Sequence, residues 1–285
     1  MTGYIGSGPY CYAHTVAMMT GATPAVVETL TGAPFGAQLD GTQPFFDPCG
    51  WDPEIGVDAA LSLLGWRCDR ESGGDPVARL RALNAPAMAG PLDMGPLSYQ
   101  TAGDGDHYVV VVDVTDDVVL LHDPHGHPYA TLPLVEFIPA WEGKPVEYCA
   151  EPYVLRSRFV REREVSEVDA MWASIPQAIQ WLDGATDAVT AMTGQDFDAD
   201  TRMLLAKFAI RLGARRLADA SVNLRALGLT EAAGVLDDQA RLVGGLQYPL
   251  VTGDTRAMAD GLRRLAPTYN QLRDTLRAEY VRVRG

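Results

Sequence analysis

The chain of 285 residues is long enough for one large domain or two ordinary ones, and its 47% hydrophobic and 21% charged residues are typical of a soluble globular protein. No run approaches 18 uninterrupted apolar residues, and no basic residue precedes an apolar N-terminal segment, so neither a membrane span nor a signal peptide is expected. The four cysteines (11, 49, 68 and 149) do not suggest a disulfide framework. The sequence contains no Cys-x-x-Cys pair, so a zinc knuckle is not expected. We therefore expect a cytoplasmic protein with free thiols.

The net charge of −14 is unevenly placed along the sequence. Residues 1–150 hold 19 Asp and Glu against 5 Lys and Arg, whereas residues 151–285 hold 18 of each kind. The acidity has two interpretations: a solvated surface that keeps the protein in solution, or an approach that attracts a cationic substrate. Either one disfavours binding to DNA or RNA.

Apolar spacing and turn residues predict the elements of the first half of the chain. Helices are expected over residues 11–19, 24–30, 54–64 and 75–83. Strands are expected over residues 85–90, 107–114, 118–123 and 129–132, with an extended stretch over 148–160. Residues 31–53, rich in Gly, Pro and aromatic side chains, are expected to form a long ordered loop, and residues 133–138 a short helical turn.

Beyond Glu164 the apolar residues recur at intervals of three and four. This periodicity predicts helices over residues 171–182, 201–227, 230–242 and 255–280. We therefore predict an α+β domain over residues 1–163, followed by an all-α helical domain over residues 164–285.

Cys11 is the first candidate for chemistry. The helix-hostile run Gly6-Ser7-Gly8-Pro9 ends just before it, so Cys11 is expected in the first turn of a helix. Unpaired N–H groups and the positive end of the helix dipole favour a thiolate there, and would also stabilise an oxyanion on a carbonyl that the sulfur attacks. Taken alone, Cys11 is better explained as a small buried residue.

His107 and Asp123 supply the partners that such a nucleophile needs. His107 begins one predicted strand and Asp123 ends the next, so an antiparallel hairpin would bring the two side by side. Asp123 would then orient the imidazole so that its other nitrogen faces Cys11. Alone, His107 is explained as a half-solvated residue at a strand start, and Asp123 as an Asp-Pro turn residue.

Other residues carry weaker signals. His122, His125 and His127 surround Asp123 and suggest a metal site, but two prolines constrain the loop, so no metal or cofactor is predicted. His14 is expected to be a packed histidine. Arg211, Arg215 and Arg216 would suit an acidic carrier protein or a phosphopantetheine group, but a solvated helix face explains them better.

Together these motifs resemble a known family. A Cys at a helix start, Gly-Asp-His-Tyr-Val-Val-Val at 105–111 and Leu-His-Asp-Pro at 121–124 are similar to the papain-like thiol enzymes. Within them, Gly8-Pro9-Tyr10-Cys11-Tyr12-Ala13 and Thr31-Gly32-Ala33-Pro34-Phe35-Gly36 resemble the butirosin biosynthesis protein H family more than the bacteriocin leader peptidases. The similarity covers residues 5–140 best.

The resemblance implies a papain-like fold and a catalytic set. Cys11 would be the nucleophile, His107 the base and Asp123 the orienting residue. The implied activity is acyl transfer from a carrier-protein thioester to an amine during antibiotic biosynthesis, a part of secondary metabolism. Expected partners are an acyl carrier protein and an amine acceptor, cationic if the acidity has a role; self-association into a homo-oligomer is left open.

One departure from the papain-like pattern bears on the reaction. Papain-like peptidases usually place a glutamine six residues before the cysteine to complete the oxyanion hole, and this position is Ile5 here. Ser7 is a candidate replacement donor. Loss of such a donor costs about 100-fold or more in rate on an amide, and a thioester tolerates the loss better because it is more reactive. This favours an acyltransferase over a cysteine peptidase or amidase; a non-catalytic binding protein is the third class considered.

Overall fold

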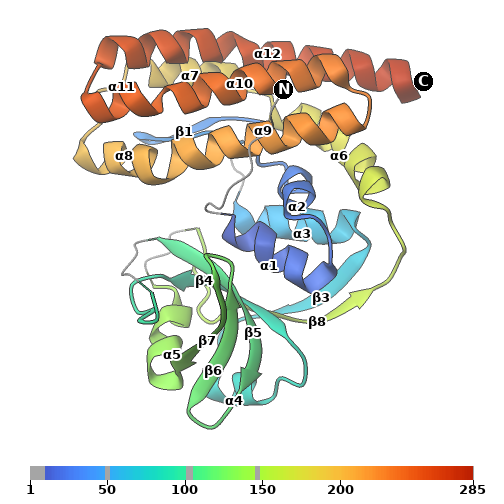
Figure 1. Cartoon of the computed structure of the whole chain (residues 1–285), viewed down its shortest axis with the longest axis vertical. Coiled ribbons are helices and arrows are strands. Elements are labelled where there is room, and N and C mark those ends of the chain that lie inside the picture. Colours follow the sequence, from blue (N-terminus) through green and yellow to red (C-terminus); the bar gives the residue numbers. More distant parts are fainter. Residues whose placement is uncertain (1–9, 49–51, 101–104, 145–147, 285) are drawn as a thin grey trace. The chain divides into compact units, whose positions relative to one another are not determined.

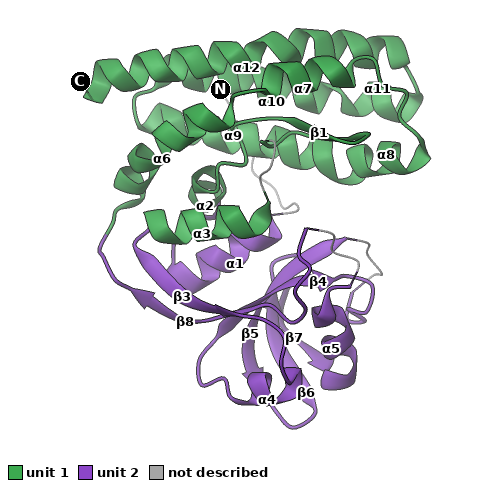
Figure 2. Ribbon diagram, turned by 180° about the vertical axis from the view of Figure 1, so that it is seen from behind, with its two compact units in different colours: residues 1–9, 25–63, 165–285 green, residues 10–24, 64–164 purple. Residues whose placement is uncertain are grey.

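The computed structural model describes residues 10–48, 52–100, 105–144 and 148–284. Within these ranges the chain forms two compact units, coloured separately in Figure 2. The sheet unit consists of residues 10–24 and 64–164, and the helical unit consists of residues 25–63 and 165–284. The helical unit is therefore built from two separate parts of the sequence.

The sheet unit is organised around six antiparallel strands (Figure 1). Their order across the sheet is β3-β8-β4-β5-β6-β7. The bounds are β3 Trp66–Glu71, β4 Ala87–Asp93, β5 Asp106–Val114, β6 Val118–Asp123, β7 His127–Pro133 and β8 Leu155–Arg161. The central strand β5 is buried on both faces from His107 to Val111, which is why it reads as a continuous apolar run.

Three helices complete the sheet unit: α1 Cys11–Thr20, α4 Pro76–Arg81 and α5 Leu134–Glu142. Asp75 caps α4 by accepting hydrogen bonds from the N–H groups of Val77 and Ala78. The core lies between α4, α5 and the strands, and its largest side chains include Leu80, Leu121, Phe137 and Trp141. Helix α1 packs against β4 and β5.

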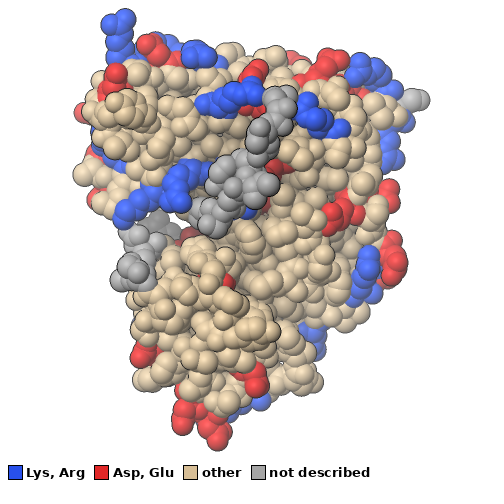
Figure 3. Space-filling model, viewed as in Figure 1, with Lys and Arg blue, Asp and Glu red and all other residues tan. Residues whose placement is uncertain are grey.

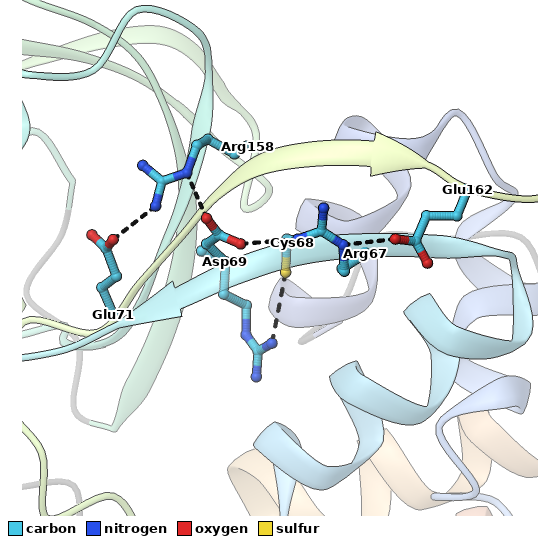
Figure 4. Close-up of polar contacts among 7 residues, drawn as sticks. Arg67, Cys68, Asp69, Glu71, Arg158 and Glu162 are labelled. Atoms are coloured by element: carbon cyan, nitrogen blue, oxygen red, sulfur yellow. Dashed lines mark hydrogen bonds and ion pairs between the residues drawn. The ribbon is translucent and has the colours of Figure 1, made fainter.

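Charged side chains join the edge strand β3 to its neighbour β8 (Figure 4). Arg158 of β8 contacts Asp69 and Glu71 of β3, while Arg67 of β3 contacts Glu162. These pairs cross between the two strands, so their polar sequences still form a stable ribbon.

The helical unit contains most of the helices and one small hairpin. Its elements are α2 Pro24–Leu30, β1 Gln38–Asp40, β2 Gln43–Phe45, α3 Pro53–Leu63, α6 Glu167–Trp181, α7 Ala185–Met192, α8 Ala199–Leu204, the π-helix η1 Leu205–Ala209, α9 Ile210–Ala226, α10 Thr230–Gly245, α11 Gln247–Thr252 and α12 Thr255–Arg284. Arg216 of α9 is buried and forms ion pairs with Glu28 of α2 and with Asp47. Asn223 of α9 donates hydrogen bonds to Ala25 O and Thr29 Oγ1. These contacts join residues 25–63 to the C-terminal helices.

The predicted α+β class and the helical C-terminal region are confirmed, and the expected helices at 11–19, 24–30, 54–64 and 75–83 are present with small shifts at their ends. Several elements were not predicted: β3, the β1–β2 hairpin within the expected loop 31–53, α7 and α11. The prediction placed residues 1–163 in one domain, whereas residues 25–63 pack with the helices beyond residue 164.

The charge is distributed differently between the two folded units than between the two halves of the sequence. The sheet unit holds 16 Asp and Glu against 9 Lys and Arg, and the helical unit holds 21 against 14, so each carries −7. The helical unit is therefore not electroneutral as a folded body, although its C-terminal segment is nearly so. Figure 3 shows that basic and acidic side chains both occur on the surface of each unit in this view. None of the described helices is both long and apolar enough to cross a membrane.

Candidate active site

Cys11 is the first residue of α1, as expected from the residues before it. Tyr10 occupies the N-cap position without a capping side-chain hydrogen bond. The Cys11 side chain is largely buried, with 8% of the residue exposed. The helix dipole favours a thiolate at this position.

The first turn of α1 lies beside the start of β5. The ring centroids of Tyr12, which follows Cys11, and Tyr108, which follows His107, are 6.1 Å apart in an edge-to-face contact. The pKa of His125 is lowered mainly by burial, and His14, one turn further along α1, makes a small contribution in the same direction. The structure thus brings the neighbourhoods of Cys11 and His107 together within the sheet unit.

His107 and Asp123 form the hydrogen bond that the hairpin predicts. The Nε2 atom of His107 lies 2.9 Å from Oδ1 of Asp123, and both side chains are fully buried. β5 and β6 are antiparallel neighbours, with Val110 opposite His122, so the start of one strand meets the end of the other. The catalytic roles of the two residues stay a prediction.

Two further donors hold the Asp123 carboxylate. The Tyr99 hydroxyl donates to Oδ2 at 2.7 Å, and the backbone N–H of His125 donates to Oδ1 at 2.7 Å. Burial alone would raise the pKa of Asp123, but the hydrogen bond and charge of His107 together with these two donors hold it at about 2. Burial and the hydrogen bond to Asp123 raise the pKa of Tyr99, which keeps its proton on the oxygen.

His125 covers one side of the His107 ring. The two ring centroids are 4.3 Å apart with an interplanar angle of 48°. Burial lowers the pKa of His125 to about 4, and the nearby His107 acts in the same direction. His125 is therefore neutral at pH 7 and places no second positive charge against a protonated His107.

The other nitrogen of His107 is the atom available for proton transfer. Nδ1 is buried and has no hydrogen-bond partner among the residues that the structure describes. With Nε2 committed to Asp123, Nδ1 is the atom that can take a proton from a thiol and return it to a leaving group. The arrangement has the groups needed for nucleophilic catalysis by a cysteine.

The remaining predicted site residues have different outcomes. Ser7 and Ile5 lie outside the described residues. His122 accepts a hydrogen bond from Tyr129 N through Nδ1, and His127 packs edge-on against Tyr99, so these two imidazoles have contacts of their own. The grouping of ligand-type atoms found among the described residues is instead His107, Asp123 and His125.

The three arginines do not form an exposed patch. Arg216 is buried with Glu28 and Asp47, and Arg215 lies 3.6 Å from Asp219. Of the three, only Arg211 is exposed. A carrier-binding surface made from all three is therefore excluded.

Tyr99 and the His125 ring were not identified from the sequence. Tyr99 lies in a turn 24 residues before Asp123, and nothing in its local sequence indicates that contact. The proximity of His125 to Asp123 in the sequence was visible, but it was considered only as a possible metal site, which was not predicted, and its packing on His107 was not foreseen.

Comparison with known proteins gives a similarity over the whole chain. Residues 178–277 match the YobF C-terminal domain family, a segment that runs from the end of α6 into α12. The chain is also similar to the uncharacterized protein YobF of Bacillus subtilis (strain 168), at 25% identity over 309 aligned positions that cover 98% of each chain. The family match lies within the helical unit and does not include Cys11, His107 or Asp123. The function is therefore argued from the site.

Proposed function

We propose that this protein is a thiol acyltransferase that moves an acyl group from a thioester to an amine through an acyl-Cys11 intermediate. The observation that carries the proposal is the buried hydrogen bond between His107 and Asp123, which leaves Nδ1 of His107 without a partner among the described residues. His107 lies in β5, and β5 packs against α1, the helix that begins at Cys11. A papain-like fold for the sheet unit, and kinship with the butirosin biosynthesis protein H family, are part of the same proposal.

The proposed reaction has two steps. The Cys11 sulfur attacks the thioester carbonyl, the carbonyl–sulfur bond of the donor breaks, and His107 gives its proton to the departing thiolate. In the second step the amine nitrogen attacks acyl-Cys11, His107 takes the proton that the nitrogen loses, and the Cys11 thiolate leaves. Asp123 stabilises the imidazolium in both steps and holds its orientation.

The acceptor is proposed to be an amine that carries a further, protonated amino group, because the nitrogen that attacks acyl-Cys11 must itself be neutral. Residues 82–143, which include His107 and Asp123, hold nine Asp and Glu and no Lys or Arg. Such a stretch lowers the energy of a nearby ammonium group. The donor is proposed to be a thioester on a carrier protein, with phosphopantetheine as part of that substrate rather than as a resident cofactor.

The test is intact-protein mass spectrometry after incubation with a phosphopantetheine thioester such as acetyl-pantetheine. The expected result is a mass increase of one acyl group, absent in Cys11→Ala, retained in Cys68→Ala, and removed when an amine is added. Hydrolysis of a peptide without transfer to the amine would support the alternative, a cysteine peptidase or amidase. No adduct and no hydrolysis would support a non-catalytic binding protein.

A further inference from the structure

The His107–Asp123–His125 group has the composition and spacing of a transition-metal site. One ligand atom from each of the three side chains lies within 4.8 Å of the other two. Imidazole nitrogens and carboxylate oxygens are the ligands that zinc takes at about 2.0–2.2 Å. The group shares His125 with the three-histidine cluster that the sequence suggested, but it leaves out His122 and His127, which make other contacts.

We propose that a divalent transition-metal ion, zinc above all, binds between His107, Asp123 and His125 and inhibits the Cys11 site. Two ligand atoms on one tetrahedral zinc ion are about 3.3 Å apart, given zinc–ligand distances near 2.0 Å. The His107 Nε2 and Asp123 Oδ1 atoms are already 2.9 Å apart. The ion can therefore replace the shared proton with a movement of a few tenths of an ångström.

His125 gives the ion both a third ligand and a way in. His107 and Asp123 are buried, whereas His125 belongs to an exposed turn between β6 and β7. Its ring already lies against the His107 ring, with centroids 4.3 Å apart. Water would supply the fourth position, as in zinc sites with three protein ligands.

Metal binding would disable His107 as a base. An imidazole ligates through a lone pair, so the proton on Nε2 must move to Nδ1 or leave to solvent. From a neutral ring the proton moves to Nδ1, and from an imidazolium it leaves to solvent while Nδ1 keeps its own proton. In both cases Nδ1 can no longer accept a proton from Cys11. The binding itself is independent of the proposed acyl transfer, whereas the inhibition rests on it.

The binding test uses isothermal titration of Zn²⁺ into the full-length Cys11→Ala protein, so that a thiolate at residue 11 cannot act as a ligand. Adding His125→Ala should weaken binding by about 10-fold or more, as expected for loss of one ligand. His122→Ala is the matched control, because His122 lies in the same hairpin but outside the group, and should change binding less than about twofold. Equal affinity with and without His125 would overturn the proposal.

The inhibition test measures alkylation of Cys11 in the otherwise wild-type protein. Micromolar Zn²⁺ should slow alkylation by about 10-fold or more, and EDTA should restore it; His125→Ala should require about 10-fold more Zn²⁺. If the His122→Ala control loses sensitivity to the same degree, the assigned ligands are wrong. Zinc binding that depends on His125 without any acyl adduct on Cys11 would leave the metal site standing and remove only the proposed acyl transfer.

Discussion

At the scale of single residues, the account depends on how Asp123 is held. Its carboxylate accepts from His107, from the Tyr99 hydroxyl and from the His125 backbone N–H. Three donors on one buried carboxylate favour its ionised form and fix its plane, so the imidazole it orients has one preferred position. Tyr99 is in this sense a positioning residue, because it acts on His107 through Asp123.

The replacement Tyr99→Phe should raise the pKa of Asp123 above its value of about 2, because one of the donors that lower it is removed. The expected rise is about 0.5–1 unit, the size of one hydrogen bond of about 1 kcal/mol. Carboxyl ¹³C NMR titration measures it directly. The exposed Tyr129 supplies the control Tyr129→Phe, which should leave the Asp123 pKa unchanged.

The lowered pKa of Asp123 also predicts a pH dependence of stability. A carboxyl with a pKa of about 2 in the folded chain and 3.8 in the unfolded chain stabilises the fold above pH 3.8. This contribution is lost as the pH falls from about 3.8 to 2. Urea unfolding across that range should show a smaller loss for Asp123→Asn than for the wild type; an equal loss would assign the acid sensitivity to other groups.

The sequence was sufficient for the His107–Asp123 bond but not for its surroundings. The bond follows from two strands joined by a tight turn, which is local information. Tyr99 reaches Asp123 from a turn outside that hairpin, and the tilt of His125 onto His107 depends on how the β6–β7 turn closes. Such contacts are set by tertiary packing and leave no periodic pattern in the chain.

At the scale of elements, the pairing of β4 with β5 places His107. Leu92 of β4 lies opposite His107. At Gly90 the backbone has a φ of +151°, and a Cβ there would lie 2.8 Å from the His107 carbonyl oxygen and 2.5 Å from Tyr108 Cδ1. Only glycine allows β5 to approach so closely at this point.

Gly90→Ala should therefore destabilise the protein by about 1–3 kcal/mol, since the new methyl group displaces β5 or the Tyr108 ring. Alkylation of Cys11 should slow as well, because His107 moves with β5. Gly21→Ala is the matched control: Gly21 also has a positive φ, of 77°, but its added Cβ meets nothing within 4 Å. Gly21→Ala should lower the stability only through backbone strain, by about 1 kcal/mol, and should leave the rate of Cys11 alkylation unchanged.

The elements that the sequence did not predict are those whose stability comes from partners. β3 carries Arg67, Asp69, Arg70 and Glu71 in six residues, which is an unusual composition for a strand. It is stabilised by ion pairs to β8, and a single strand gives no sign of the other. The apolar strands β4, β5 and β6 were predicted because burial shapes their own composition.

At the scale of the whole molecule, the helical unit depends on residues 25–63. Arg216 of α9 has 3% of its side chain exposed and is neutralised by Glu28 and Asp47 from that segment. Burial raises the pKa of Asp47, and the Arg216 charge opposes the rise. Removal of one member of such a group leaves a buried charge without compensation.

Arg216→Met should accordingly destabilise the helical unit by about 3–5 kcal/mol, read from urea unfolding of the full chain. Arg211→Met, on an exposed position of the same helix, should change stability by less than about 0.5 kcal/mol. A fragment of residues 165–285 should fail to unfold cooperatively, because it lacks the partners of Arg216. If Arg216→Met changed the stability little and the fragment unfolded cooperatively, the helical domain would begin near residue 164, as predicted from the sequence.

The charge of the molecule predicts how a substrate approaches. The nine Asp and Glu of residues 82–143, with no Lys or Arg among them, should attract a cationic acceptor. Salt screens such attraction over about 8–10 Å. The apparent KM for a diamine acceptor should rise between 20 and 500 mM salt more steeply than that for a neutral amine. Identical responses would assign the acidity to solubility alone. Since each unit carries −7, charge gives no reason for an acidic carrier to prefer the helical unit.

The central claim, that Cys11 is a nucleophile activated by His107, is tested most directly by the rate of alkylation at pH 6 with iodoacetamide, resolved by residue with mass spectrometry. A thiolate paired with an imidazolium at a helix start has a pKa well below about 8.5, so Cys11 should react faster than Cys49, Cys68 or Cys149, despite its burial. Cys68 is the most demanding comparison, because Arg156 lies 3.9 Å from its sulfur. The account predicts that His107→Ala slows Cys11 by about 10-fold or more and leaves Cys68 unchanged. Equal rates at all four cysteines, or a Cys11 rate that does not respond to His107→Ala, would contradict it.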